Sequence, residues 1–215
     1  MQPLKSLNEI CSQPDSLRND VWEAQLFESC RTSKLMIVDP QPRMGPDHWP
    51  YIFAQTGMGS TEPALKVIEW LATQGVGLVL NTHKPAPDYI FSYGMIWNFV
   101  QNGEFLTRSE SEFSGKIEIE AGAKVQAGSP SEAYLPNYVR RILRSFFTDQ
   151  EVSNPKVLVM SQDLINYDLC LSLESLGDPP ESEHDGIARA LSWFLPTHYS
   201  LLLISEKGLP PFYSL

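Results

Sequence analysis

The stretch 49-WPYIFAQTGMGSTEPALKVIEWLATQGVGLVLN-81 decides the fold class. Its first part, Trp49–Thr56, is rich in aromatic and apolar residues and predicts a strand. After a glycine-rich turn, apolar residues recur at helical spacing, and the helix that they predict stops at Gly75. The face that this helix buries is predicted to consist of Leu65, Ile68, Leu71 and Ala72. The apolar run Val76–Asn81 predicts a buried strand, so the stretch indicates the order strand, helix, strand.

Two further elements are predicted upstream. The segment Ser16–Ser29 is expected to be a helix, because apolar side chains recur in it at helical spacing. These side chains are Leu17, Val21, Trp22 and Leu26. The short apolar run Lys34–Asp39 predicts a strand, which we expect to end at Pro40 and Pro42.

The second half of the chain predicts the same order of elements. A broad apolar stripe predicts a helix over 135–147, followed by strands at Lys156–Ser161 and Tyr167–Ser175. A polar loop then leads to a helix with three inward side chains and to a last strand, Tyr199–Glu206. The inward side chains of that helix are Ile187, Leu191 and Phe194.

The same order of elements is predicted for residues 16–81 and 134–206, namely helix, strand, strand, helix, strand. We therefore predict an α+β protein of two small, similar lobes whose mixed sheets are flanked by helices. The small and polar residues of Lys116–Ser131 make this segment the expected linker. The predicted domains are 1–125 and 132–215.

Composition excludes several classes of partner. The net charge of the 215-residue chain is −10, which argues against nucleic acid and against an anionic membrane surface, because both need clustered Lys and Arg. The N-terminus lacks the apolar core of a secretory signal, and no apolar run has the length of a membrane span. Cys11, Cys30 and Cys170 are odd in number and widely spaced, which predicts free thiols. We expect a soluble cytoplasmic protein without a cofactor.

The stretch 88-DYIFSYGMIWNF-99 is unusually aromatic. It could be one long strand followed by a turn at Asn102-Gly103, or a strand that gives way to a helix over Gly94–Gln101, and residue spacing favours the helix. Five aromatic side chains bury on the order of 750–1,250 Å², so the chain itself or a partner must cover most of them. Coverage by the chain as ordinary core, a partner or dimer surface, and ligand stacking remain open. The candidate binding residues are Tyr89, Phe91, Tyr93, Trp97 and Phe99, together with Phe212 and Tyr213 near the C-terminus.

Signatures of chemistry are weak. The turn GMGSTEP lies where a phosphate-binding loop would lie, but Glu62 stands in place of the third glycine of a dinucleotide fingerprint. Its simpler interpretation is helix capping by Ser60 or Thr61. A general-base pair of His83 and Asp88 is conceivable, yet no sequence motif indicates a nucleophile near them. The chain has no C-x-x-C or H-E-x-x-H motif, so no metal site and no catalytic residue is predicted.

A family resemblance rests on element order and hydrophobicity over most of residues 49–215. The segments LPNYVRRILRSFF, NPKVLVMS, DLCLSLES and PPFYS resemble the C-terminal domain of the enhanced-serine-sensitivity protein family, SseB. The segment YIFAQTGMGSTEPALKVIEWLATQGVGLVLN resembles the N-terminal domain of that family. The resemblance implies an intracellular bacterial protein with a binding or regulatory role.

The leading hypothesis is therefore a non-catalytic interaction or regulatory protein, with a protein partner or a second copy as its ligand. The runner-up is a small-molecule-binding protein or enzyme that uses the Gly57–Thr61 turn and a pocket between the lobes. A third possibility is a dimeric, acidic chaperone of the secretion type.

Overall fold

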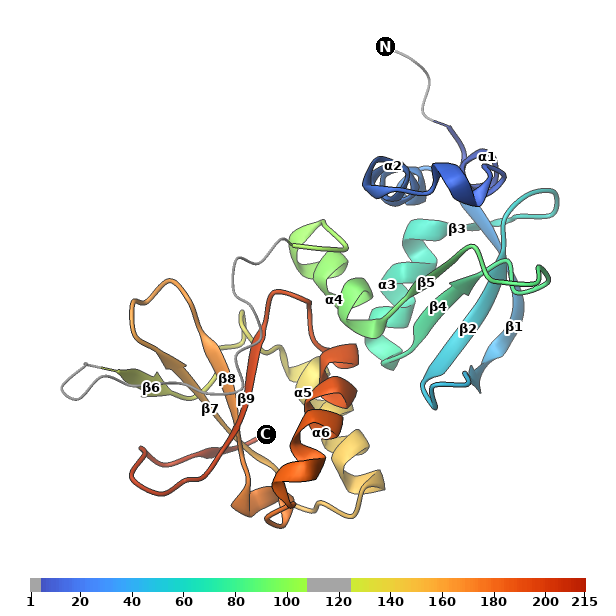
Figure 1. The fold of residues 1–215 in the computed structure, drawn as a ribbon. Coiled ribbons are helices and arrows are strands. Elements are labelled where there is room, and N and C mark those ends of the chain that lie inside the picture. The colour runs from blue at the N-terminus through green and yellow to red at the C-terminus, as the bar shows by residue number, and fades with distance from the viewer. Residues whose placement is uncertain (1–4, 108–124) are drawn as a thin grey trace. The chain divides into compact units, whose positions relative to one another are not determined.

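A computed structural model describes residues 5–107 and 125–215. The chain divides into two compact units, residues 1–106 and 107–215, each with its own sheet (Figure 1). The chain therefore has the predicted α+β class, with two mixed sheets and helices in each unit. Part of the predicted linker lies outside the described residues, and the described part, Gln126–Gly128, is a strand of the second unit.

The first unit contains four α-helices, a short 3-10 turn and five strands. Its helices are α1 (Leu7–Cys11), α2 (Asp20–Cys30), α3 (Ala64–Gln74) and α4 (Tyr93–Asn102), with the 3-10 turn at Asp15–Leu17. Its strands are β1 (Lys34–Met44), β2 (Pro50–Gln55), β3 (Glu62–Pro63), β4 (Gly77–Leu80) and β5 (Tyr89–Phe91). The sheet order is β3-β1-β2-β4-β5, and β2 and β4 are its parallel pair.

The stretch 49–81 forms β2, α3 and β4, as its pattern predicts. Strands β2 and β4 are parallel because α3 carries the chain back to the end of the sheet where β2 begins. Gly75 ends α3 with a φ of 75°, a left-handed conformation that glycine adopts without steric cost. At Gly77 a Cβ atom would lie 2.6 Å from the ring of Tyr51, so only glycine leaves room for that ring.

All four helices of the first unit pack against the same face of its sheet. The shared core takes Leu26 from α2, Ile68 from α3, Ile96 from α4, and Ile52 and Leu80 from the strands. Figure 1 shows α3 and α4 on one side of this sheet. Because side chains alternate along a strand, the residues between these core positions point to the other side.

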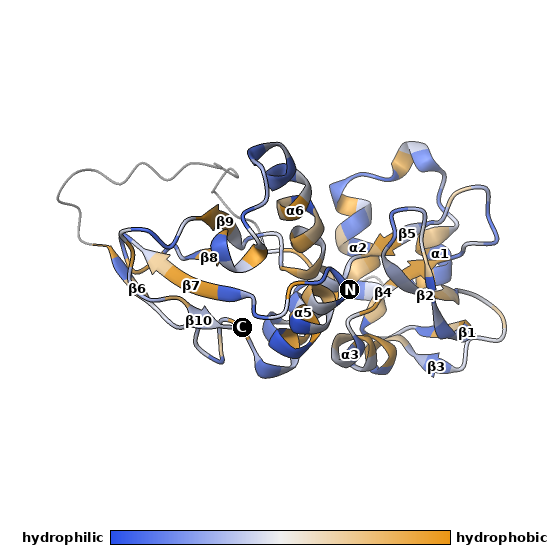
Figure 2. Ribbon diagram, turned by 90° about the horizontal axis from the view of Figure 1, so that it is seen from below, coloured by the Kyte–Doolittle hydropathy of each residue, from blue (hydrophilic) through white to orange (hydrophobic). Residues whose placement is uncertain are grey.

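The described part of the second unit, residues 125–215, contains two long helices, one 3-10 turn and five strands. These are α5 (Asn137–Asp149), α6 (Glu181–Phe194), the 3-10 turn Glu174–Leu176, β6 (Gln126–Gly128), β7 (Lys156–Ser161), β8 (Asp168–Ser172), β9 (Ser200–Ile204) and β10 (Tyr213–Ser214). The sheet order is β10-β7-β8-β9, and β6 also pairs with β7. Strands β8 and β9 are parallel, and the other pairs are antiparallel. In Figure 2, β7 is mostly hydrophobic, as expected of a strand with neighbours on both sides.

The two units repeat one topology. In the first unit, α2 leads into the antiparallel pair β1 and β2, and α3 crosses over to β4, parallel to β2. In the second, α5 leads into β7 and β8, and α6 crosses over to β9, parallel to β8. Such crossovers are right-handed in nearly all proteins, so α3 and α6 cover corresponding faces of their sheets.

Three expectations about the first unit were wrong, two about element ends and one about burial. Helix α2 begins at Asp20 rather than Ser16, because the Asn19 side chain caps it by accepting hydrogen bonds from two backbone N–H groups. Strand β1 continues past its prolines to Met44, since its ladder with β2 shifts register between Ile37 and Arg43 and needs no proline N–H there. Leu17 and Val21, placed on the buried face by the sequence, are exposed.

Candidate functional site

Asp88 is the centre of a buried polar network at the carboxyl ends of β2 and β4. Its side chain is 1 % exposed and accepts hydrogen bonds from Arg18 Nη2, Lys84 Nζ and Asn81 Nδ2, each at 2.6 Å. Asn81 Oδ1 in turn accepts the backbone N–H of Thr56 at 2.8 Å. The network therefore ties the ends of the two parallel strands to the N-terminal segment that carries Arg18.

The electrostatics of this network favour an ionised Asp88. Burial works to raise the pKa of Asp88, but hydrogen bonds from Lys84, Asn81 and Arg18 outweigh burial, and the pKa is lowered. Both carboxylate oxygens are occupied by these donors. His83, the conceivable partner of Asp88 in a general-base pair, is exposed, and the described side-chain hydrogen bonds of Asp88 go to the other three residues. A carboxylate held in this way clamps a loop and is a poor general base.

The glycine-rich turn between β2 and α3 is used for structure as well. The N–H of Ser60 donates to the carbonyl of Gly57 at 3.2 Å, and the N–H of Thr61 donates to Leu35 at 3.2 Å. The N–H of Ala64, at the start of α3, donates to the carbonyl of Ser33 at 3.0 Å. Neither hydroxyl caps α3, which begins after Pro63 without a side-chain cap, because Glu62 and Pro63 pair with β1. These amides are therefore not available to cradle a phosphate.

The second unit has a corresponding polar network at the carboxyl ends of β8 and β9. Ser172 Oγ donates to Glu206 Oε1 at 2.6 Å, and Lys156 Nζ lies 3.1 Å from the same oxygen. Glu174 accepts the backbone N–H of Glu206 at 2.9 Å and also accepts from the hydroxyl of Ser205. Hydrogen bonds from these neighbours lower the pKa of both glutamates. As in the first unit, the charged groups satisfy one another.

The aromatic stretch is a strand followed by a helix, as residue spacing indicates. Its helix is α4, with Ser92 as the N-cap and Gly103, at a φ of 77°, as the C-cap. The aromatic binding candidates on this stretch are almost fully buried, except for Tyr89, which is half-buried. The exposed fractions are Phe91 0 %, Tyr93 0 %, Trp97 1 % and Phe99 6 %.

Specific contacts hold these aromatic rings in place. The hydroxyl of Tyr93 donates to the carbonyl of Ala72 at 2.7 Å. The hydroxyl of Tyr89 donates to Glu23 Oε1 at 2.6 Å. Burial raises the pKa of Tyr89, and the hydrogen bond to Glu23 raises it further. The rings of Phe91 and Phe99 pack in the core of the first unit. Phe91 and Phe99 therefore belong to the core of the first unit, with Tyr89 packed against it.

The C-terminal candidates lie on a segment that covers the second sheet. Phe212 packs, with Leu209, against a buried cluster on the face of the sheet opposite α5 and α6. That cluster consists of Leu158, Met160, Cys170 and Leu202. Tyr213 is 43 % exposed, and its backbone extends the sheet by pairing with β7. The chain therefore uses its own C-terminal segment as a lid on this face.

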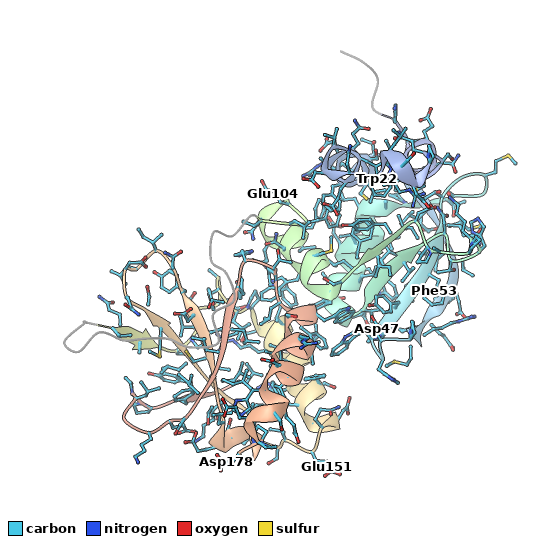
Figure 3. All side chains as sticks on the ribbon, in the orientation of Figure 1. Trp22, Asp47, Phe53, Glu104, Glu151 and Asp178 are labelled. Atoms are coloured by element: carbon cyan, nitrogen blue, oxygen red, sulfur yellow. The ribbon has the colours of Figure 1, made fainter. Side chains whose placement is uncertain are left out.

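The corresponding face of the first sheet is only partly covered. We call it the open face and define it by Met36, Val38, Phe53, Val79 and Ile90. Val79 pairs with Ile90 on one side and with Phe53 on the other, so these three form a row across β5, β4 and β2. Phe53, labelled in Figure 3, lies on the side of the sheet away from α3 and α4.

Exposure separates the open face from its counterpart in the second unit. Val38 is 46 % exposed and Ile90 is 49 % exposed, Met36 and Phe53 are half-buried, and Val79 between Phe53 and Ile90 is 5 % exposed. The four buried residues of the second unit's face are 0–4 % exposed. An ion pair, Arg43 with Asp39 at 2.7 Å, adjoins the row on β1, where Asp39 pairs with Phe53. An apolar centre with a polar rim is the usual anatomy of a protein-binding surface.

The cysteines are placed where they are chemically inert. Cys11, Cys30 and Cys170 are free and buried, and burial raises the pKa of each thiol to about 12. Among the described residues, no group of three or more His, Cys, Asp or Glu side chains is arranged to hold a metal ion. No described helix has both the length and the apolar character needed to cross a bilayer.

Comparison of the chain with protein-family models, curated proteins and solved structures found no match.

Sequence reasoning missed the two features that distinguish the site. Arg18 and Asp88 are 70 positions apart, and nothing in the local pattern pairs them. The open face had a partial signal, because alternation in β2 places Phe53 opposite to Ile52 and Ala54. Which of the two faces the helices cover became evident only in the structure.

Proposed function

We propose that this chain is a non-catalytic interaction protein and that the open face of its first sheet binds a protein partner. The single observation that supports the proposal is the contrast between corresponding faces of two sheets with the same topology. The second unit covers its face with Leu209 and Phe212, whereas Val38 and Ile90 on the first are about half exposed. Large apolar surfaces that remain exposed on a folded protein typically mark interaction sites.

The segment that covers the face of the second sheet also indicates which kind of ligand the open face would bind. In the second unit the lid is an extended segment, 209-LPPF-212, in which two apolar side chains flank two prolines. An extended, uncharged segment with spaced apolar side chains is therefore the ligand that we assign to the open face. Asp39, which pairs with Phe53, and its ion-pair partner Arg43 offer charges of both signs to such a segment.

The lack of free reactive groups at the described polar networks supports a binding role over catalysis. Asp88 is held by three donors, and Glu174 and Glu206 are held by neighbours in the second unit. A binding or regulatory role is also what the resemblance to the SseB family implies. Three buried, unpaired cysteines fit the reducing environment of the cytoplasm, which we propose as its location.

The test compares lysine variants of three exposed apolar residues, Val38, Ile90 and Val21. Val38→Lys and Ile90→Lys each place a charge on the open face, and Val21→Lys places the same charge on α2, where Val21 is 65 % exposed. We expect proteins captured from the native host by the wild type and by Val21→Lys to be lost with both open-face variants, as measured by quantitative mass spectrometry. A capture profile that is the same for all four chains, with all four equally folded by circular dichroism, would refute the proposal.

A further inference from the structure

Among the described strands that end the two sheets, β9 is the longest. Strands β3, β5, β6 and β10 lie at sheet edges and are two or three residues long. Strand β9 is five residues long and ends the order β10-β7-β8-β9. In the described part of the chain, no strand pairs with its outer edge. Proteins normally shorten, charge or cover such an edge, because its free N–H and C=O groups attract another strand.

The strand β9 itself carries no proline, charge or bulge that would protect its edge. Its sequence, SLLLI, contains no proline and no charge. Its register with β8 runs without a shift from Ser200 to Ile204, so no bulge twists the edge away. Its outer edge is therefore a regular template for another strand.

The first unit shows which kind of strand pairs with the edge that corresponds to β9. Strand β4 is the counterpart of β9, and its outer edge is paired with β5 in antiparallel orientation. Topological equivalence thus predicts that β9 takes an antiparallel strand in the same place. A two-fold axis through the edge supplies this orientation automatically, because it places two copies of one strand antiparallel to each other.

We propose that β9 pairs with β9 of a second copy, so that two chains form one continuous sheet. In the symmetric register, Leu202 lies opposite Leu202 of the second copy, and Leu201 lies opposite Leu203. The remaining pair is Ser200 with Ile204. None of the three kinds of pair contains a charged side chain, so no like charges meet across the two-fold axis. This inference goes beyond the proposed function, since it concerns a different unit and a different surface.

A pocket beside β9 fits this register. It has a volume of about 150 Å³ and is lined by the end of α6, the following loop and the start of β9. Its lining residues are Ser192, Leu195, Pro196, Thr197, Tyr199 and Leu201. Because Leu201 lines it, Leu203 of the second copy, opposite Leu201 in the proposed register, is directed toward it. An apolar cavity of about 150 Å³ can hold a molecule the size of benzene, so a leucine side chain fits.

The half-buried state of Leu203 is explained by this exchange. Leu201 and Leu202 are each 4 % exposed, while Leu203 remains partly exposed in the single chain. Each copy would insert its Leu203 beside Leu201 of the other. A five-residue strand pair buries less than a standard interface of about 1,600 Å², so we expect a dissociation constant in roughly the micromolar range.

Sedimentation velocity of the full chain over a concentration series tests the dimer. We expect a shift from monomer to dimer with concentration, which Leu203→Lys abolishes and Val38→Lys on the open face leaves unchanged. Since Leu203 is partly exposed, its lysine variant should keep the circular dichroism spectrum of the wild type. A wild type that sediments as a monomer at every concentration, or a dimer that persists in Leu203→Lys, would overturn the proposal.

Disulfide trapping tests the register independently of the lysine variant. Cys170 lies opposite Leu202 on β8, so both cysteine variants are made in a Cys170→Ala background. In the symmetric register, Leu202→Cys then places two thiols directly across the two-fold axis, whereas Leu203→Cys places them diagonally apart. Under mild oxidation we expect a disulfide-linked dimer from Leu202→Cys and little from Leu203→Cys. Equal trapping of both variants, or trapping of neither, would exclude this pairing. Loss of partner capture by Val38→Lys is measured separately, so the failure of one proposal does not imply the failure of the other.

Discussion

Asp88 shows how a single residue can look catalytic and act as a clamp. It is buried, yet it is ionised, because Arg18, Lys84 and Asn81 supply donors at 2.6 Å. Removing one partner of such a buried group leaves the other charges uncompensated, which is costly. We expect Asp88→Asn to lower the free energy of unfolding by about 3 kcal/mol, as measured by urea denaturation.

The control for this substitution is Asp15→Asn. Asp15 also pairs with Arg18, at 3.2 Å, but its side chain is 92 % exposed. Exposed ion pairs contribute about 0–1 kcal/mol, so this variant should be nearly as stable as the wild type. Equal effects of the two substitutions would show that burial of the Asp88 pair does not matter for stability.

Acid should weaken the fold through the same residue. The pKa of Asp88 is lower in the folded chain than in the unfolded chain. Its contribution to stability is therefore complete above the unfolded pKa of about 3.9 and is lost as the pH falls through the folded pKa. We expect the free energy of unfolding to fall with pH below about 4 and to fall less steeply in Asp88→Asn. Parallel pH profiles for the two chains would contradict this assignment.

At the scale of elements, β4 depends on the absence of a side chain at its first residue. A Cβ at Gly77 would lie 2.6 Å from the Tyr51 ring and 2.8 Å from the carbonyl oxygen of Phe91. We expect Gly77→Ala to lower stability by about 1–3 kcal/mol, measured by thermal denaturation, because the neighbouring strand must shift. In contrast, Gly186→Ala on α6 meets no atom within 4 Å and should stabilise that helix by about 0.5–1 kcal/mol. Destabilisation of similar size at both glycines would count against this account.

Much of the element order could be predicted from the sequence, because local patterns determine it. Alternation in β2, helical spacing in α3 and the left-handed Gly75 together predict the unit that covers residues 49–81. The role of the aromatic stretch could not be predicted, because the burial of Phe91 depends on packing with Phe27, which lies far from it along the chain. The ends of β1 were also missed, since the register shift that accommodates Pro40 and Pro42 depends on pairing with β2.

At the scale of the whole molecule, two units with one topology differ in how they cover one face of the sheet. Phe212 is part of the lid over the second sheet, while Tyr213 next to it is 43 % exposed. We expect Phe212→Ala to lower the free energy of unfolding by about 2 kcal/mol and to increase binding of a hydrophobic dye, because the buried cluster becomes accessible. Tyr213→Ala is the matched control and should cost less than about 1 kcal/mol. Equal dye binding by the two variants would indicate that the C-terminal segment does not act as a lid.

The binding role of the open face is tested most directly by a photo-crosslinking amino acid at position 38, in the full chain expressed in its native host. We predict a discrete crosslinked product with another protein, which disappears when Ile90→Lys is added to the same chain. The same amino acid at position 21, also an exposed valine, should give no such product. The absence of a product at position 38, or an equal product at position 21, would contradict the account.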